Sequence, residues 1–250
     1  MNKIVVEPGS MRADEKFHIT VKSEGPYLVF GRPPLVQQFI IQNAEGESWA
    51  FQAGRSFAMA DEPTALCRCG ASHRKPYCDG SHRNADWDPQ LTDPGDPILA
   101  GAEMNEGPQA VLSDNPHYCV FARFCDAGDR AWNLVQESDD PEKAELLIRE
   151  ANHCPGARLS AWDAAGEIPE EPKFEPSLGL IEDPKIDASG GLWVRGGIPI
   201  QREDGFTYEI RNRTVLCRCG QSSNKPYCDG THASAHFDDG LGGRPEGKKW

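Results

Sequence analysis

Short runs of β-branched and aromatic residues, separated by glycine and proline, recur along the first quarter of the chain. They lie at residues 4–6, 17–21, 27–30, 39–41 and 47–51. Runs of this length and composition, bounded by turn residues, predict β-strands joined by hairpins. A shorter series follows much later, at residues 192–194, 198–200 and 206–210, with Asp204-Gly205 as a hairpin signal. The pattern therefore predicts two related β scaffolds, one near each end of the chain.

The middle of the chain, residues 115–163, has a different pattern. Residues 131–135 and 158–162 are compact apolar runs that predict strands. Between them, residues 141–152 place apolar side chains at helical spacing, with Asp140 as the cap and a proline in the first turn. The predicted fold class is α+β and mainly β, with two β scaffolds and a small α/β segment between them.

Residues 67–82 and 217–232 repeat one another at an offset of 150 residues, and each copy carries three cysteines and one histidine with the spacing C-x-C-x8-C-x3-H. These residues are Cys67, Cys69, Cys78 and His82 in the first copy, and Cys217, Cys219, Cys228 and His232 in the second. Plain core thiols would have no reason to repeat this spacing. The pattern therefore predicts metal ligands in both copies.

The spacing alone leaves two kinds of metal centre open. Three thiolates and one imidazole suit tetrahedral zinc, although zinc modules usually separate paired cysteines by two to four residues rather than by one. A binuclear iron–sulfur cluster also suits the pattern, with the C-x-C pair on one iron and the later cysteine and histidine on the other. On spacing we favour the iron–sulfur cluster over zinc.

Three further pairs of residues flank the ligands at equivalent positions. They are Asp79 and Asp229, Ser72 and Ser222, and Arg68 and Arg218. The aspartates predict the N-caps of short helices. The serines donate either to a sulfur or to the backbone. The arginines either offset the charge of a metal centre or, as is commoner for arginine, lie solvated at the surface.

The longer pattern C-x-C-x2-S-x3-P-x-C-D-G-[ST]-H is complete in both copies. It resembles the cluster-binding motif of the CDGSH iron–sulfur family, the mitoNEET type. The resemblance implies one redox-active 2Fe–2S cluster per copy, held by three cysteines and one histidine, with the histidine near solvent. Family members often form two-fold dimers of one motif each. Two motifs in one chain therefore imply two CDGSH-type β scaffolds in an internal pseudo-dimer, and a protein that is a monomer.

The other three cysteines, Cys119, Cys125 and Cys154, lie in the middle segment. Their order, with a proline after the last, resembles a divergent single-cluster ferredoxin domain that lacks its central cysteine. They form a candidate third iron–sulfur site, either for a three-iron cluster on the three thiolates or, with an outside ligand such as His117 or His153, for a four-iron cluster. We favour a vestigial ferredoxin fold in which they are core thiols, because a cluster short of a ligand is easily lost.

Composition narrows the function classes. The 250 residues carry a formal net charge of −13, which disfavours nucleic acid as a partner because phosphate binding depends on lysine and arginine. No apolar run approaches the roughly 20 residues that span a bilayer, so we expect no membrane partner. The nine cysteines are an odd number at ligand spacing, and no signal peptide is present, which predicts a reducing cytoplasm rather than disulfides.

Composition shifts also predict the domain organisation. The expected segments are N-terminal strands at 1–24, a first CDGSH domain at 25–90, a linker at 91–114, the ferredoxin-like segment at 115–163, a linker rich in proline and acids at 164–190, a second CDGSH domain at 191–240 and a tail at 241–250. The proline density of both linkers argues against long helices there.

The leading functional hypothesis is an iron–sulfur protein with two 2Fe–2S clusters that acts in electron transfer or cluster transfer. Its partner would be a redox or cluster-acceptor protein. The alternative is a structural or interaction module in which the metal only staples loops. The sequence contains no nucleophile–base motif and no phosphate loop, so we expect no enzymatic activity. Colour separates the two hypotheses, because iron–sulfur protein is red-brown and zinc protein is colourless.

Overall fold

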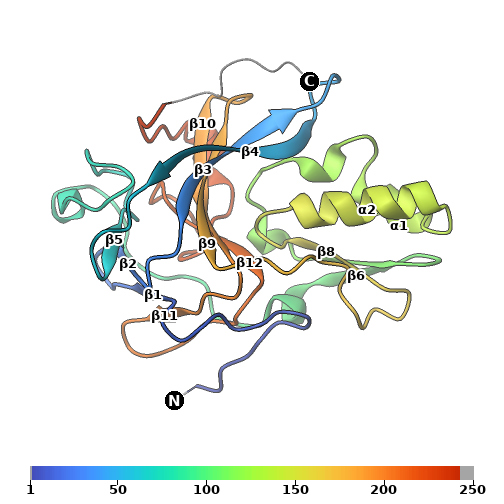
Figure 1. Ribbon diagram of the computed structural model, residues 1–250, viewed down its shortest axis with the longest axis horizontal. Helices are drawn as coiled ribbons and strands as arrows, with labels where there is room; N and C mark the ends of the chain where they lie inside the picture. Colours follow the sequence, from blue (N-terminus) through green and yellow to red (C-terminus); the bar gives the residue numbers. More distant parts are fainter. Residues whose placement is uncertain (1, 243–250) are drawn as a thin grey trace.

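Strands dominate the computed structural model, which describes residues 2–242 (Figure 1). Within these residues the strands form sheets of four, five and three strands. The short helices in loops are η1 (Ser81–Arg83), η2 (Ile98–Gly101), η3 (Pro116–Tyr118), η4 (Phe124–Asp126) and α3 (Thr231–Ser234). The predicted fold class, α+β and mainly β, is confirmed. In this part of the chain no helix is long and apolar enough to cross a bilayer.

The four-stranded sheet has the order β11-β1-β2-β5. Its members are β1 (His18–Val21), β2 (Tyr27–Phe30), β5 (Thr64–Leu66) and β11 (Ile200–Arg202). β2 runs antiparallel to both β1 and β5. β11 comes from the other half of the chain and pairs in parallel with β1, so that Ile19 lies opposite Ile200. Both isoleucines are buried, and this pairing therefore closes part of the core.

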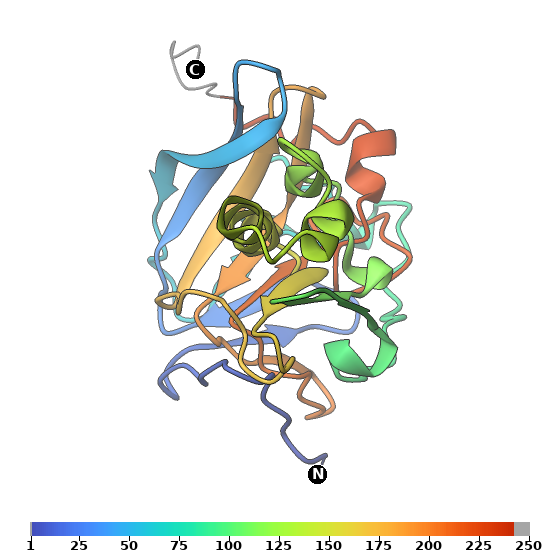
Figure 2. The same ribbon diagram turned by 90° about the vertical axis from the view of Figure 1, so that its right-hand side faces the viewer.

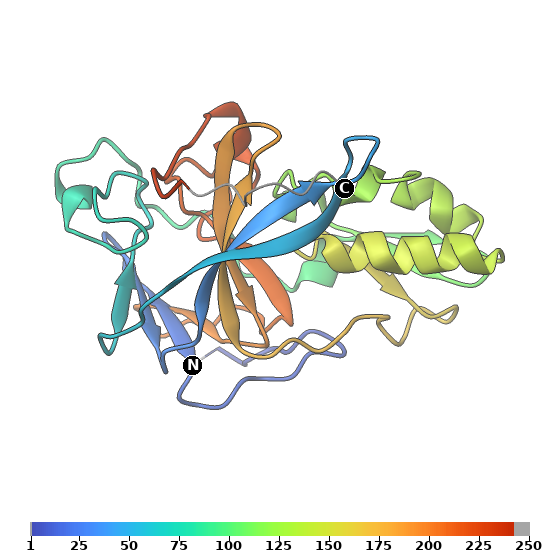
Figure 3. The ribbon, with the colours of Figure 1, turned by 45° about the horizontal axis from the view of Figure 1, so that its top comes forward.

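The five-stranded sheet has the order β12-β10-β9-β3-β4. Its members are β3 (Leu35–Gln42), β4 (Ser48–Phe57), β9 (Ser177–Asp183), β10 (Ala188–Arg195) and β12 (Arg213–Leu216). β10 runs antiparallel to β9 and β12, whereas β3 pairs in parallel with β9 and places Leu35 opposite Leu178. β9 and β10 cross the centre of the molecule (Figure 3).

The two sheets exchange strands reciprocally. β3 follows β2 in the chain but joins the sheet of β9, β10 and β12, and β11 follows β10 but joins the sheet of β1, β2 and β5. The registers correspond, because Tyr27 lies opposite Leu66 in one sheet as Leu192 lies opposite Leu216 in the other. One hydrophobic cluster contains residues from both halves. The predicted pseudo-dimer with a shared β scaffold is confirmed.

The middle segment packs at one side of the molecule (Figures 1 and 2). β8 (Leu159–Trp162) of this segment lies in an antiparallel sheet with β6 (Glu103–Glu106) and β7 (Val111–Asp114), which precede the segment in the chain. α1 (Ala131–Gln136) and α2 (Pro141–His153) pack on this sheet and share a hydrophobic cluster with it. The helix predicted at 141–152 is confirmed, and the Asp140 side chain accepts a hydrogen bond from the amide of Glu142 at 2.9 Å.

The strand predicted at 131–135 is wrong, because these residues form α1. Ala131, Leu134 and Val135 are its buried residues, and the positions i, i+3 and i+4 lie on one face of a helix. A short apolar run does not distinguish a strand from a buried helix by its periodicity. Packing against α2 decides in favour of the helix.

Other predicted elements also need correction. The stretch 164–190, predicted as a linker, contains β9, and the stretch 91–114 contains β6 and β7. The strands predicted at 4–6 and 206–210 are reduced to isolated bridges. The tail predicted at 241–250 lies, beyond Gly242, outside the described residues.

Candidate metal centres

The first donor set is built at the end of β5. Cys67 directly follows this strand, and the Cys78 amide donates to the Ala65 carbonyl at 2.9 Å, which brings the third cysteine back beside the first. The Sγ atoms of Cys67 and Cys69 are 3.8 Å apart. The Cys78 Sγ lies 3.4 Å from Nδ1 of His82. The four predicted ligands thus form two close pairs.

The second donor set repeats this construction after β12. The Cys228 amide donates to the Val215 carbonyl at 2.9 Å. The Sγ atoms of Cys217 and Cys219 are 3.8 Å apart, and the Cys228 Sγ lies 3.3 Å from Nδ1 of His232. The match between copies shows that the repeated sequence folds into the same loop twice.

Two pairs of donors are a different arrangement from four converging donors. Two thiolates bound 2.3 Å from one tetrahedral metal are about 3.8 Å apart, so each C-x-C pair can serve a single metal ion. Among residues 2–242, however, no three cysteine, histidine or acidic side chains come together around one ion position. The donor sets fit a binuclear centre, with one pair for each metal, better than they fit one zinc ion.

Equivalent hydrogen bonds stabilise the cysteine loop in both copies. The hydroxyls of Ser72 and Ser222 donate to the carbonyls of Tyr77 and Tyr227 at 2.6 and 2.7 Å, which decides their role in favour of the backbone. The Asp79 carboxylate accepts from the amides of Ser81 and His73, as Asp229 does from Thr231 and Ser223. The residue at the N-cap position is the following glycine, so each aspartate caps from one position further back.

The reading of Arg68 and Arg218 as solvated surface arginines is wrong. Each is only 2% exposed. Arg68 donates to four backbone carbonyls, those of Lys22, Ser23, Gly25 and Pro89. Arg218 donates to the carbonyls of Ile181 and Gly190 and to two carboxylates. Each arginine therefore ties its cysteine loop to the neighbouring strands, a role that charge counting does not reveal.

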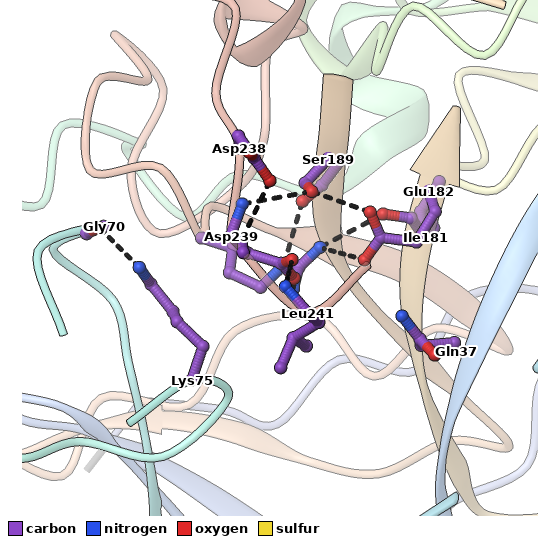
Figure 4. Close-up of polar contacts among 12 residues, drawn as sticks. Gln37, Gly70, Lys75, Ile181, Glu182, Ser189, Asp238, Asp239 and Leu241 are labelled. Carbon is purple, nitrogen blue, oxygen red and sulfur yellow. Dashed lines mark hydrogen bonds and ion pairs between the residues drawn. The ribbon is translucent and has the colours of Figure 1, made fainter. Parts of the chain in front are cut away.

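The carboxylates around Arg218 belong to a buried network (Figure 4). Arg218 pairs with Glu182 and Asp239, and the Ser189 hydroxyl donates to Glu182 at 2.7 Å. Burial raises the pKa of Glu182 to about 7, although Arg218 opposes this. In the first copy Arg68 donates to neutral carbonyls and lies 4.6 Å from the centre of the Trp87 ring, so the two loops are held by different electrostatics.

The two cysteine loops touch each other across the pseudo-two-fold. Gly70 has φ +80° and Gly220 has φ +80°, which suits glycine. A Cβ on Gly70 would lie 2.4 Å from the Cys219 carbonyl oxygen, and one on Gly220 would lie 2.5 Å from that of Cys69. The contact is reciprocal, and it leaves no room for a side chain on either glycine.

Hydrogen bonding and burial shift the pKa values of the ligands. The contact with Cys69 lowers the pKa of Cys67, and the pKa of Cys69 is raised in return. Burial raises the pKa of Cys228 and lowers that of His232 to about 4. Cys228 and His232 are therefore held in their neutral forms unless a cation binds, as expected of buried metal ligands.

The two histidines differ in exposure. His82 is partly exposed, whereas His232 is only 5% exposed. Gly80, two residues before His82, has nothing within 4 Å of its Cβ position. At Gly230 a Cβ would lie 3.1 Å from the Cys119 carbonyl oxygen and 3.2 Å from Phe121 Cβ. The expectation that the histidine lies near solvent therefore fails for His232, because the middle segment covers it.

The three cysteines of the middle segment line the same cavity, although they do not converge on one ion position. Cys119, Cys125 and Cys154 all line one cavity of about 20 Å³. None is in a disulfide, and burial raises the pKa of Cys125 to about 12. His117 and His153 do not line this cavity, and Nδ1 of His153 lies 2.8 Å from the Arg149 carbonyl oxygen. The structure thus gathers the thiols of the candidate third site without the outside histidine ligand.

Comparison with known families assigns the two loops. The family model for the iron-binding zinc finger of CDGSH type matches residues 24–83 and 189–233. Each match contains one complete donor set. Both segments therefore match the CDGSH family of iron-binding domains, which supports an iron–sulfur protein. Comparisons with curated proteins and with solved structures gave no match.

Several residues that position the donor sets were not predicted from the sequence. The Tyr27 hydroxyl donates to the Cys217 carbonyl at 2.8 Å and so links the first scaffold to the second loop. Its partner lies 190 residues away, and no local pattern marks such a contact. Gly70 and Gly220 do carry a signal, since each occupies the same place in both copies. A glycine repeated beside a ligand predicts close backbone packing.

Proposed function

We propose that each CDGSH segment holds one 2Fe–2S cluster. In the first, Cys67 and Cys69 bind one iron, and Cys78 and His82 bind the other. In the second, the ligands are Cys217 with Cys219 and Cys228 with His232. When bound, the clusters supply one-electron redox chemistry. The protein then acts in electron transfer or cluster transfer, and not as an enzyme.

The observation that carries this proposal is the pairing of the donors. In both copies the C-x-C sulfurs are 3.8 Å apart, and the later cysteine and histidine approach within 3.4 and 3.3 Å. A binuclear cluster takes two protein ligands at each metal and fills the remaining positions with its own sulfides. A zinc staple, the alternative, takes all four donors at one ion.

Metal analysis and a visible spectrum test the proposal. The purified protein should be red-brown and contain about four irons and four sulfides per chain. Zinc in a colourless protein would establish the structural module instead. A count of about two irons would mean that only one of the two donor sets is loaded.

The candidate third site fits a vestigial ferredoxin fold better than a further cluster. A cavity of about 20 Å³ has room for little more than one water molecule. Changing Cys119 and Cys154 together to serine should then leave the visible spectrum unchanged. Loss of part of the spectrum, or about seven or eight irons per chain in the unmodified protein, would establish a third cluster.

The partner follows from the same chemistry. A one-electron centre needs a redox protein, and a transferable cluster needs an acceptor protein, so we expect one of these two and neither nucleic acid nor a membrane. The reciprocal strand exchange supplies within one chain the contact that a dimer of single-motif chains would make. We therefore expect a monomer in the cytoplasm, which size-exclusion chromatography with light scattering and cell fractionation would check.

A further inference from the structure

The second donor set is covered by the middle segment. Cys228 is only 1% exposed and belongs to a hydrophobic cluster with Val120, Ala122 and Phe124. The Tyr118 ring packs edge-on against Tyr227, with ring centres 5.1 Å apart. This cover, residues 118–124, leaves the ligand edge of the second copy without direct access from solvent.

Polar contacts fasten the cover at both of its ends. Arg123 pairs with Asp183 of β9 at 2.7 Å, and Asp183 is only 3% exposed. The Asn224 side chain donates to the His117 carbonyl at 3.0 Å. The cover is therefore part of the packed structure and not a loop resting on it.

The corresponding edge of the first copy opens into a cleft. A cleft of about 680 Å³ is lined by Cys78, His82 and Arg83 of the first cysteine loop and by Lys22, Gly25 and Glu203 from other parts of the chain. A Cβ on Gly25 would lie 4.0 Å from Nε2 of His82. The histidine therefore faces the cleft across a residue that has no side chain.

The charges in this cleft are unequally compensated. Glu203 pairs with Lys22 and also accepts hydrogen bonds from Ser23. Arg83 is exposed, and among residues 2–242 its guanidinium forms no ion pair. Glu24 supplies the remaining negative charge in the lining of the cleft. A free guanidinium beside the ligand histidine suits a carboxylate, which it can bind in a planar, bidentate way.

We infer that the protein exchanges electrons with its partner through the first copy alone, at the Arg83 cleft, and that the partner places a carboxylate of its own surface on Arg83. The inference rests on the proposed function, since it needs a redox centre in the first copy. In each encounter one electron leaves the reduced protein for a one-electron acceptor protein. The polar rim suits a transient, salt-sensitive contact, which is typical of redox partners.

In this arrangement the middle segment controls access of the partner to the second copy. Because it seals the second centre, an acceptor receives that electron only after transfer to the first centre. The reciprocal contact of Gly70 with the Cys219 backbone places the two cysteine loops side by side for such a transfer.

A matched pair of arginine variants tests the inference. Arg83 and Arg74 are both exposed and lie in the same loop region, but only Arg83 lines the cleft. The fully reduced protein is mixed with ferricyanide, which becomes ferrocyanide by taking one electron. Arg83→Ala should slow the fast oxidation phase about three- to tenfold at low salt, and Arg74→Ala should change it less than twofold. With the cation hexaamminecobalt(III) as acceptor, Arg83→Ala should not slow the reaction.

A binding measurement supplies a readout that does not depend on turnover. The paramagnetic and unreactive trianion hexacyanochromate(III) should broaden the amide signals of residues 22–25 and 83, and Arg83→Ala should abolish this broadening. Gly25→Leu, which fills the space before His82, should slow the fast phase for both acceptors while the spectrum stays the same. Equal effects of Arg83→Ala and Arg74→Ala, or broadening centred on residues 118–124, would overturn the inference. A preparation without about four irons per chain contradicts the proposed function instead.

Discussion

The two CDGSH copies share their ligands but not their surroundings. The sulfur–sulfur and sulfur–nitrogen distances agree within 0.1 Å between the copies. Yet His232 is 5% exposed under residues 118–124, whereas His82 faces an open cleft. Short-range sequence thus determines the geometry of the donor pairs, and segments far away in the sequence determine access to them. A duplicated motif can in this way serve two different roles within one molecule.

The largest expected effect is on the free energy of unfolding. It tests whether the two copies contribute equally to the contact between their cysteine loops. Gly70→Ala and Gly220→Ala each push a methyl group against a carbonyl oxygen 2.4 or 2.5 Å away, at a positive φ. Each should lower the free energy of unfolding by about 2–4 kcal/mol. Gly205→Ala is the control, because it has φ +86° and nothing within 4 Å, and it should cost only about 1 kcal/mol. Urea denaturation measures all three. Losses as small as that of Gly205→Ala would show that the two loops do not pack as described.

A ligand exchange tests whether the copies coordinate metal alike. His82→Cys and His232→Cys each supply a fourth thiolate, which should lower the potential of the altered centre by on the order of 100 mV, because thiolate carries more negative charge than imidazole. We expect a similar shift in midpoint potential in both copies, because the distances within the donor pairs are nearly the same. Redox titration of each variant, with the unaltered copy as an internal reference, gives the result. A variant whose potentials match those of the unmodified protein would show that its histidine is not a ligand.

The donor residues and the two β scaffolds could be predicted from the sequence, because both are marked by local patterns. β9 could not be predicted, because its residues lie in a proline-rich stretch that is typical of a linker. They form a strand only where they pair with β3 and β10. The burial of Arg68 and Arg218 could not be predicted either, because their partners are mostly backbone carbonyls, and these look the same in every sequence. The cover over His232 depends on residues more than a hundred positions away, which no local pattern links to it.

The cover packs against α2, where the rings of Phe124 and His153 have centres 5.2 Å apart. Glu150 of this helix allows a test of stability against pH. Its carboxyl is fully buried and both oxygens lack a hydrogen-bond partner. Burial raises its pKa to about 9, with Asp126, Asp129 and Glu47 adding to the shift and Arg149 opposing it. A carboxyl whose folded pKa is raised contributes stability below its unfolded pKa of about 4.3 and loses it as pH rises toward 9.

Glu150→Gln should remove this pH dependence. At pH 8 the variant should be more stable than the unmodified protein by about 1–2 kcal/mol, and at pH 4.5 the two should differ little. Urea denaturation at both pH values measures the difference. Parallel pH curves for the two proteins would show that Glu150 ionises in the folded state as it does in the unfolded chain.

The smallest expected effect is a difference between the two midpoint potentials. His73, Arg74 and Arg83 surround the first donor set, where the second has Ser223, Asn224 and Ala233. Positive charge and solvent exposure both favour the reduced centre, so the first should have the higher potential, by about 20–50 mV at low salt. Exposed charges are screened, so the gap should narrow as salt rises, and Arg74→Ala with Arg83→Ala should narrow it further. Redox titration at two ionic strengths measures the gap. A single wave at low salt would mean that the different surroundings of the copies affect access but leave their potentials alike. A wider gap at high salt would mean that the exposed charges do not cause the difference.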